Sequence, residues 1–303
     1  MTDSRGRPGR LGVGVVGAGR VGAVLGSALR AAGHAVVGVS AVSAASRERA
    51  ETLLPAVPVM AVPDVVRGAE LVLLAVPDDA LPDLVAGLAA TGSWQPGQIA
   101  VHTSGRFGWR VLEPAVAAGV IPLAVHPAMT FTGTSLDLVR LADCCFGVSA
   151  PNAAQPIEQA LVVEMGAEPV VVAEEMRPLY HAALAHGANH LGTLVAQALD
   201  LLAAAGVPDG DRLLGPLLSA SLDNALRHGD AALTGPVSRG DAGTVAAHLE
   251  VLGSSGVVDA AAAYRVLART TADRALASGR LRADAAADLL AALAEPPPPD
   301  RIP

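Results

Sequence analysis

Lysine is absent from this chain of 303 residues, and aromatic residues make up only 2% of it. All 21 basic residues are therefore arginine. The absence of lysine excludes every mechanism that uses a lysine amine as nucleophile or proton donor. Hydrophobic residues still make up 51% of the chain, so Ala, Val and Leu can build a sizeable core and widespread disorder is excluded.

Cysteines, basic clusters and long apolar runs are also scarce. The two cysteines, Cys144 and Cys145, are adjacent, and no Cys or His spacing indicates zinc, so we expect plain thiols and no metal. The net charge of −8, with no basic stripe, argues against nucleic acid and anionic membranes as partners. No stretch reaches the ~20 apolar residues of a membrane span, and the apolar run 11–16 is too short for a signal-peptide core. We therefore expect a cytoplasmic protein that binds a small molecule.

Short apolar runs alternate with helical patterns in the first half of the chain. Strands are predicted at Leu11–Val16, Ala35–Val39, Val57–Met60, Leu71–Val76, Ile99–Thr103 and Ile121–Val125, and more weakly at Cys145–Ser149 and Pro169–Val172. Helices are predicted after the first strand to Ala32, at Ser43–Leu54, from Asp78 to about Ala90, near Trp109–Ala118 and at Asn152–Met165. This alternation predicts a parallel sheet with crossover helices.

The second half contains only helical patterns. Helices are predicted at Arg177–Ala205, Arg212–His228, Ala242–Leu252, Val257–Ser278 and Ala283–Ala294. The expected fold class is α/β: a Rossmann-type doubly wound parallel sheet followed by an all-α C-terminal domain. The expected domains are a flexible N-terminus (1–10), a dinucleotide-binding domain (11–173), a helical substrate and dimerisation domain (174–294) and a disordered, proline-rich tail (295–303).

A glycine-rich motif follows the first predicted strand and opens the first helix. Gly17, Gly19 and Gly22 have the G-x-G-x-x-G spacing of a dinucleotide-binding loop. The first glycine permits the tight turn, the second lets the backbone approach a pyrophosphate, and the third lets helix and strand pack closely. With Arg20 and Val21, the helix N-terminus offers free N–H groups and a partial positive charge to the phosphates. The alternative is a glycine-rich turn without a ligand.

The end of the second predicted strand indicates which dinucleotide fits. Enzymes that use NAD carry Asp or Glu there, to bind the ribose 2′-hydroxyl. This chain has Gly38-Val39-Ser40 instead, followed by Ser43, Arg47 and Arg49. Hydroxyl and guanidinium groups suit a 2′-phosphate, so NADP is favoured. The alternative is that these side chains only cap and solvate a helix.

Several short segments resemble a known group of proteins. They are Val76-Pro77-Asp78-Asp79, His102-Thr103-Ser104-Gly105, His126-Pro127 with Thr130-Phe131, Tyr180-His181 with Asn189, and Leu233-Thr234-Gly235-Pro236 with Arg239-Gly240-Asp241. With the glycine-rich loop, they resemble the 6-phosphogluconate dehydrogenase-like superfamily, which includes ketopantoate and pyrroline-5-carboxylate reductases. The best resemblance is to Rossmann-like oxidoreductases whose C-terminal half is a domain of unknown function. The resemblance implies an oxidoreductase but no particular substrate.

Three of the resembling segments lie where predicted strands end, which is where open parallel sheets bind ligands. In the resembled reductases these turns border the nicotinamide and the substrate. The resemblance therefore places Val76, Pro77 and Ser104 at the cofactor, and Ser104 also at the reacting atoms. His126 either donates a hydrogen bond to the substrate or, if protonated, holds its carboxylate, and Thr130 belongs to the same segment. The alternatives are an ordinary turn at Ser104 and a hydrogen-bonded strand end at His126.

The helical half contributes the remaining candidates. Related dehydrogenases carry a lysine and an asparagine on the equivalent helix. Here the asparagine corresponds to Asn189, and His181 is the nearest replacement for the missing lysine as proton donor. Arg239 either binds a carboxylate of the substrate or forms a local salt bridge with Asp241. A buried structural role for His181 is the alternative.

These observations together predict an NADP-dependent oxidoreductase that reduces a small carbonyl compound, in the manner of ketopantoate reductase. The substrate is expected to be a carboxylate, most simply a 2-oxo acid. The alternatives are an imine reductase of the pyrroline-5-carboxylate type and a non-catalytic, dinucleotide-binding regulator. The apolar faces of the helical half predict a homodimer.

Overall fold

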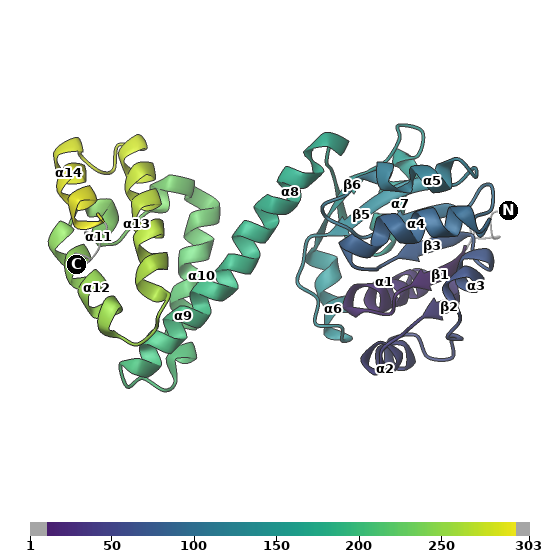
Figure 1. Ribbon diagram of the computed structural model, residues 1–303, viewed down its shortest axis with the longest axis horizontal. Coiled ribbons are helices and arrows are strands. Elements are labelled where there is room, and N and C mark those ends of the chain that lie inside the picture. Colours follow the sequence, from purple (N-terminus) through teal and green to yellow (C-terminus); the bar gives the residue numbers. More distant parts are fainter. Residues whose placement is uncertain (1–10, 295–303) are drawn as a thin grey trace, which may run out of the picture. The chain divides into compact units, whose positions relative to one another are not determined.

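The computed structural model describes residues 11–294, which fall into two compact units, one ending at Gly187 and the other beginning at Ala188 (Figure 1). The segments 1–10 and 295–303, expected to be flexible and disordered, lie outside the described residues. None of the described helices is long and apolar enough to cross a membrane.

The first unit is built around a seven-stranded sheet with the order β2-β1-β3-β4-β5-β6-β7. Its strands are β1 (Gly12–Val16), β2 (Ala35–Ser40), β3 (Leu71–Leu74), β4 (Ile99–His102), β5 (Ile121–Pro127), β6 (Cys145–Ser149) and β7 (Glu168–Val171). All neighbouring pairs are parallel except β5 and β6. After β1 the chain first adds β2 on one side and then crosses over to add β3 on the other, so β1 lies between β2 and β3. The predicted Rossmann-type α/β fold is confirmed.

Helices cover both faces of this sheet because its strands alternate their apolar side chains between two cores. On β3, Leu71 and Leu73 face one core, which α1 (Arg20–Ala31), α2 (Ala44–Leu53) and α7 (Gln155–Glu164) complete. Val72 and Leu74 face the other core, formed with α3 (Val62–Arg67), α4 (Leu81–Ala90) and α5 (Glu113–Val116). The short α6 (Leu136–Arg140) follows β5, and α8 (Arg177–Leu184) follows β7.

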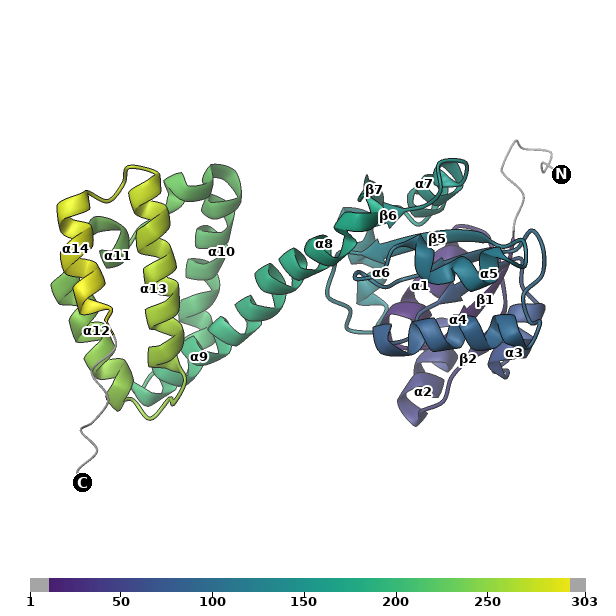
Figure 2. The same cartoon turned by 45° about the horizontal axis from the view of Figure 1, so that its top comes forward.

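The second unit is entirely helical within the described residues. It contains α9 (His190–Ala204), α10 (Gly210–His228), α11 (Pro236–Arg239), α12 (Ala242–Ser254), α13 (Ala260–Ala277) and α14 (Ala283–Ala292). Its core is small, and α11 to α14 supply it with residues such as Val245, Ala272 and Leu289. Figure 2 shows α9 and α10 side by side, and neither contributes to that core.

Three sequence predictions differ from the structure. The pairing of β5 with β6 is antiparallel, so the sheet is not wholly parallel. The segment Val57–Met60 forms only an isolated bridge, between Val39 and Val59, and Pro58 has no N–H with which to extend a ladder. The single helix predicted at Arg177–Ala205 consists of α8, a π-helical turn at Ala185–Asn189, and α9.

Candidate functional site

The glycine-rich loop has a backbone that only glycine tolerates at two of its three motif positions. Gly17 has a φ of +97°, and a Cβ there would lie 2.5 Å from the carbonyl oxygen of Ala75. A Cβ on Gly22 would collide with the carbonyl oxygen of Gly17, so α1 packs directly against the loop. Gly19 differs, because a Cβ there would meet nothing within 4 Å. The side of Gly19 that a side chain would cover is therefore open to a ligand.

This open side lies at the start of α1, which suits an anion. Gly19 is the N-cap of α1, with no side-chain cap and no acidic residue in the first turn. The N–H groups of the first turn and the positive end of the helix dipole therefore face that position. The loop fits a dinucleotide pyrophosphate, which the backbone of Gly19, Arg20 and Val21 would hold.

Ser40, at the end of β2, holds this loop in place through two hydrogen bonds. It is buried, its hydroxyl accepts a hydrogen bond from the N–H of Gly17 at 2.9 Å, and its carbonyl accepts one from Ala18. Ser43 accepts a hydrogen bond from the N–H of Ser46 and so caps α2. Ser40 and Ser43 were predicted to bind the cofactor. In the structure, Ser40 orders the glycine-rich loop and Ser43 caps a helix, and such local roles were the alternative stated above.

Two arginines on α2 differ in their relation to the loop. Arg47 is exposed, whereas Arg49 donates from Nε to the carbonyl oxygen of Ala18 at 3.3 Å. Arg49 also contacts the turn at Gly133, where an added Cβ would lie 3.0 Å from its Cδ and 3.1 Å from Cγ of Arg20. The guanidinium of Arg49 is therefore the cation that the structure places beside the glycine-rich loop.

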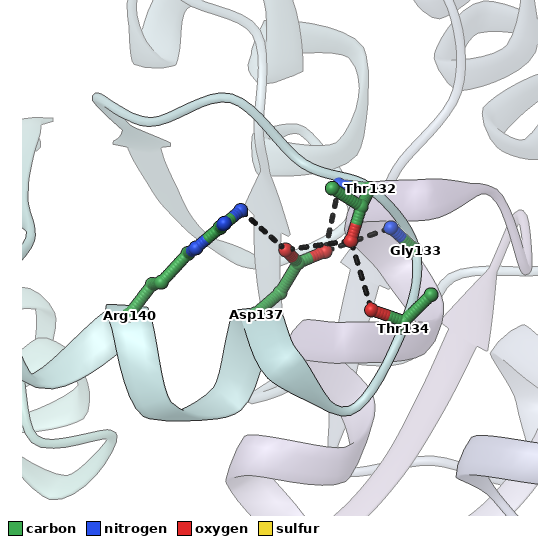
Figure 3. A network of polar contacts seen from close by, with 5 residues as sticks. All are labelled: Thr132, Gly133, Thr134, Asp137 and Arg140. Carbon is green, nitrogen blue, oxygen red and sulfur yellow. Dashed lines mark hydrogen bonds and ion pairs between the residues drawn. The ribbon is translucent and has the colours of Figure 1, made fainter. Parts of the chain in front are cut away.

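The turn at Gly133 is held in place by the buried carboxylate of Asp137 (Figure 3). Asp137 accepts hydrogen bonds from the N–H groups of Thr132 and Gly133, at 2.8 and 2.7 Å, and from the Thr132 hydroxyl at 2.9 Å. Burial raises the pKa of this carboxyl, but these hydrogen bonds outweigh burial and lower it below its ordinary value. The ionised Asp137 thus orders the turn that packs on Arg20 and Arg49.

The ends of β4 and β5 bring a second group of polar residues to the same edge of the sheet as the glycine-rich loop. Leu74 of β3 pairs with Val16 and with His102, and His102 pairs with Ala124 of β5. Because these strands are parallel, the segments after Val16, Leu74 and His102 and the last residues of β5, from Val125 to Pro127, all lie at one edge of the sheet. The loop and the β5 end are three strand positions apart, or roughly 14 Å at ~4.8 Å a strand.

His102, at the end of β4, is a structural residue. Its Nδ1 accepts a hydrogen bond from the N–H of Ser104 at 3.2 Å, so the other ring nitrogen, Nε2, donates to the carbonyl oxygen of Gly108 at 2.9 Å. Burial lowers its pKa to about 3, which keeps the ring neutral. Ser104 is itself buried, and its hydroxyl accepts from the N–H of Phe107 at 3.1 Å. The hydroxyl proton of Ser104 remains available to a ligand.

His126, Tyr180 and His181 form a cluster between β5 and α8. Nδ1 of His126 shares a hydrogen bond of 2.9 Å with the Tyr180 hydroxyl, and the rings of His126 and His181 meet edge to face at 5.8 Å between centroids. Both imidazoles pack on Gly105, where a Cβ would lie 2.6 Å from His181 and 2.8 Å from His126. The predicted catalytic residues His126 and His181 are therefore brought together, with Ser104 preceding Gly105.

The charge of His126 follows from its surroundings. Burial lowers its pKa to about 4, and electrostatic interactions with Arg177 and His181 act in the same direction. His126 is therefore neutral near pH 7, which disfavours the expectation that it holds a carboxylate as a cation. Burial also raises the pKa of the Tyr180 hydroxyl, so that group keeps its proton.

Arg177 anchors this cluster, although the sequence analysis did not single it out. Its side chain is fully buried and donates to the carbonyl oxygens of Ser104, Phe107 and Gly147, at 2.6, 3.0 and 2.8 Å. Three residues earlier, Glu174 accepts from the N–H groups of Trp109 and Arg110 and from the Ser149 hydroxyl. The segment 174–177 thus ties the ends of β4 and β6 to the start of α8. A Glu-x-x-Arg spacing at the start of a helix is too common to reveal this.

The remaining predicted residues lie apart from this cluster or in the other unit. Val76 lies against the glycine-rich loop, its Cγ1 3.5 Å from where a Gly17 Cβ would be, while Pro77 and Thr130 are exposed. Asn189 and Arg239 are exposed residues of the helical unit. Among the described residues, no group of His, Cys, Asp and Glu is arranged to hold a metal ion.

Comparison with known families places this fold. A Rossmann-like domain model matches residues 1–127, and a model for a domain of unknown function (DUF2520) matches residues 144–271. The chain is therefore a Rossmann-like protein with a C-terminal DUF2520 domain, and the resemblance seen in the sequence is confirmed. No curated protein matches the sequence.

Solved structures share the fold over most of the chain. A Bacteroides fragilis protein, provisionally described as an NADP oxidoreductase, is 21% identical, with a TM-score of 0.73 over 87% of this chain and 98% of its own. An imine reductase from Myxococcus stipitatus in complex with NADP⁺ is 18% identical, with a TM-score of 0.65 over 89% and 95%. Pyrroline carboxylate reductase from Plasmodium falciparum with NADP is 14% identical, with a TM-score of 0.55 over 88% and 100%. These likenesses show the fold.

Proposed function

We propose that the protein is an NADP-dependent oxidoreductase that reduces a small carbonyl compound. The substrate class that we favour is a 2-oxo acid. The observation that carries the proposal is the glycine-rich loop, open at Gly19, on the same sheet edge as the His126–Tyr180–His181 cluster. A dinucleotide bound at the loop extends along that edge toward the cluster. Solved structures with the same fold include oxidoreductases and complexes with NADP.

The preference for NADP rests on the end of β2. No carboxylate lies between the end of that strand and α2, so the position at which NAD enzymes bind the 2′-hydroxyl carries no group that would repel a 2′-phosphate. Arg49 lies beside the loop, and Arg47, two residues earlier on α2, is exposed. A guanidinium binds phosphate through two parallel hydrogen bonds, which supports NADP.

The chemistry divides between the cofactor and the chain. When bound, the reduced dinucleotide supplies a hydride, and the chain must supply a proton and orient the reacting double bond. Without lysine, the candidate donors in the cluster are His181, Tyr180 and Ser104, because the low pKa of His126 leaves it without an acidic proton near pH 7. We assign the proton to His181 and the orientation of the substrate oxygen to Ser104.

Imine reduction is the second candidate, and the neutral state of His126 favours it. A protonated imine carries its own proton, so its reduction needs no strong acid from the protein. Two of the solved structures with this fold are an imine reductase and a pyrroline carboxylate reductase. A regulator that binds the dinucleotide without turnover is the third reading.

The test combines NADPH binding with NADPH consumption. We expect NADPH to bind at least several-fold more tightly than NADH, and to be consumed with a 2-oxo acid or a cyclic imine from a panel of both. Equal affinities for the two dinucleotides would contradict the NADP preference. Binding without consumption across the panel would favour a regulator.

A matched pair of substitutions checks that binding uses the glycine-rich loop. Gly19→Leu places a side chain where the protein has no atoms, so it should leave the fold intact and abolish NADPH binding. Gly87→Leu, on the exposed face of α4, also meets nothing within 4 Å and should bind NADPH as the parent does. Equal binding by both variants would place the dinucleotide elsewhere.

A further inference from the structure

The helical unit contains two adjoining cavities of opposite character. One, of about 330 Å³, is lined mainly by apolar side chains of α9, α12 and α13, such as Leu194, Leu201, Leu252 and Leu267. The other, of about 460 Å³, is lined by polar groups that include Ser238, Arg239 and Arg280. Thr234 lines both cavities, so the two lie next to each other.

The polar cavity carries two guanidinium groups without a carboxylate partner. Within residues 11–294, neither Arg239 nor Arg280 lies within ion-pair distance of an Asp or Glu, whereas Arg274 pairs with Asp230 at 2.6 Å. No Asp or Glu lines either cavity. Two unpaired guanidiniums in a cavity without carboxylates are suited to an anion.

The local salt bridge considered for Arg239 is not formed. Asp241 instead caps α12, where its two oxygens accept from the N–H and the hydroxyl of Thr244 at 3.0 and 2.7 Å. These hydrogen bonds from Thr244 are the main cause of the lowered pKa of the Asp241 carboxyl, and the charge of Arg239 lowers that pKa further. Arg239 thus lies near Asp241 without forming an ion pair with it, so its guanidinium can still bind a ligand.

The apolar cavity has few polar groups, and two of them satisfy each other. Nδ1 of His248 and the hydroxyl of Tyr264 share a hydrogen bond of 3.0 Å, and their rings meet edge to face. The remaining walls are mostly leucine and alanine side chains with Pro236 and Val237. Such walls fit a compact hydrocarbon group, since apolar burial drives its binding without any hydrogen bond.

We propose that the helical unit binds a small amphipathic carboxylate. Its apolar body occupies the cavity between α9, α12 and α13, and its carboxylate reaches past Thr234 to Arg239 and Arg280. The inference goes beyond the proposed function, because all residues that line the two cavities belong to the helical unit and none belongs to the His126–Tyr180–His181 cluster. Binding at the two cavities requires neither NADPH nor turnover.

Calorimetric titration of the full chain, without NADPH, tests this inference with three probes. 4-Phenylbutanoate has both the apolar body and the carboxylate, 4-phenylbutan-1-ol lacks the charge, and acetate lacks the body. We expect 4-phenylbutanoate to bind at least tenfold more tightly than either of the others. Equal affinity for the acid and the alcohol would overturn the proposal, because the arginines would then contribute nothing.

Two matched pairs of variants locate the binding. Arg280→Gln should weaken 4-phenylbutanoate about tenfold and leave 4-phenylbutan-1-ol unchanged, while Arg282→Gln, which removes a partner of Asp284, should change neither. Leu194→Trp should weaken both probes by narrowing the apolar cavity. Leu191→Trp, on the same helix with similar exposure but outside the cavity, should weaken neither. The same affinities in both members of either pair would overturn the proposal.

The outcomes also separate this inference from the proposed function. Loss of carboxylate binding in a chain that still binds and consumes NADPH would overturn the inference alone. Carboxylate binding by a chain that fails to bind NADPH would leave the inference standing and remove the proposed function.

Discussion

His181 is the residue on which the proposed proton transfer depends. Its ring packs on Gly105 and lies edge to face with His126, which holds it at the end of β4 beside Ser104. We expect His181→Asn to lower kcat by about 10²–10⁴-fold, the usual cost of losing a general acid, and to leave NADPH affinity unchanged.

Steady-state kinetics and an NADPH titration on the folded variant measure this effect. His228→Asn, an exposed histidine at the end of α10, serves as the control and should keep the parent kcat. If kcat of His181→Asn stays within about threefold of the parent, His181 is not the donor, and an imine that carries its own proton becomes the better substrate class.

The roles of residues that meet a local backbone requirement could be predicted from the sequence. The roles of residues that depend on hydrogen-bond partners far away in the chain could not. The spacing of Gly17, Gly19 and Gly22 predicts their local geometry, since each glycine answers a backbone requirement. The role of Arg177 depends on carbonyl oxygens 30 to 73 residues away in the chain. No local pattern reveals such contacts. For the same reason, the sequence could not show that Arg49 contacts the glycine-rich loop while Arg47 is exposed.

At the scale of elements, periodicity predicted most helices and strands but not the direction of β6. Strand composition is the same for either direction, and the connection decides it. The β5–β6 connection contains only an irregular turn, the five-residue α6 and a short 3-10 helix at Leu141–Asp143, without the long crossover helix of a parallel connection. The π-helical turn at Ala185–Asn189 was missed for a similar reason, because its sequence keeps the pattern of an ordinary helix.

The helix α7 carries a buried carboxyl that should make stability depend on pH. Glu158 is fully buried, and neither of its oxygens has a hydrogen-bond partner among the described residues. Burial raises its pKa to about 8, against the opposing effect of Arg177. The folded protein therefore keeps Glu158 neutral where the unfolded chain, with a pKa near 4.5, is ionised. The resulting stability is complete below pH 4.5 and is lost as pH rises toward 8.

The window from pH 7 to 8 isolates this effect. The lowered pKa values of His102 and His126 cost stability only as pH falls below about 6.5. We expect the parent to lose at most about 1 kcal/mol of unfolding free energy between pH 7 and 8, and Glu158→Gln to lose none of it. Urea unfolding at the two pH values measures the difference, with Glu51→Gln on the exposed face of α2 as control. Parallel losses in the parent and Glu158→Gln would refute this account.

At the scale of the whole molecule, two exposed leucines of α10 indicate a partner surface. Gly210 is the only buried residue of α10. Leu213 and Leu217 lie one turn apart on one face of α10, at 59 and 60% exposure. Exposed apolar side chains that share a helix face are typical of a protein interface. We expect a second copy of the chain to cover them.

Light scattering at micromolar concentration should therefore give twice the mass of one chain. Replacing Leu213 and Leu217 together by glutamate should produce monomers, because two charges cannot be buried in an apolar interface without partners. Ser219→Glu adds a charge to the same helix at an exposed polar position and should leave the dimer intact. A parent protein that scatters as a monomer would show that these leucines are simply exposed to water. A dimer that survives the double substitution would place the interface on another surface of the chain.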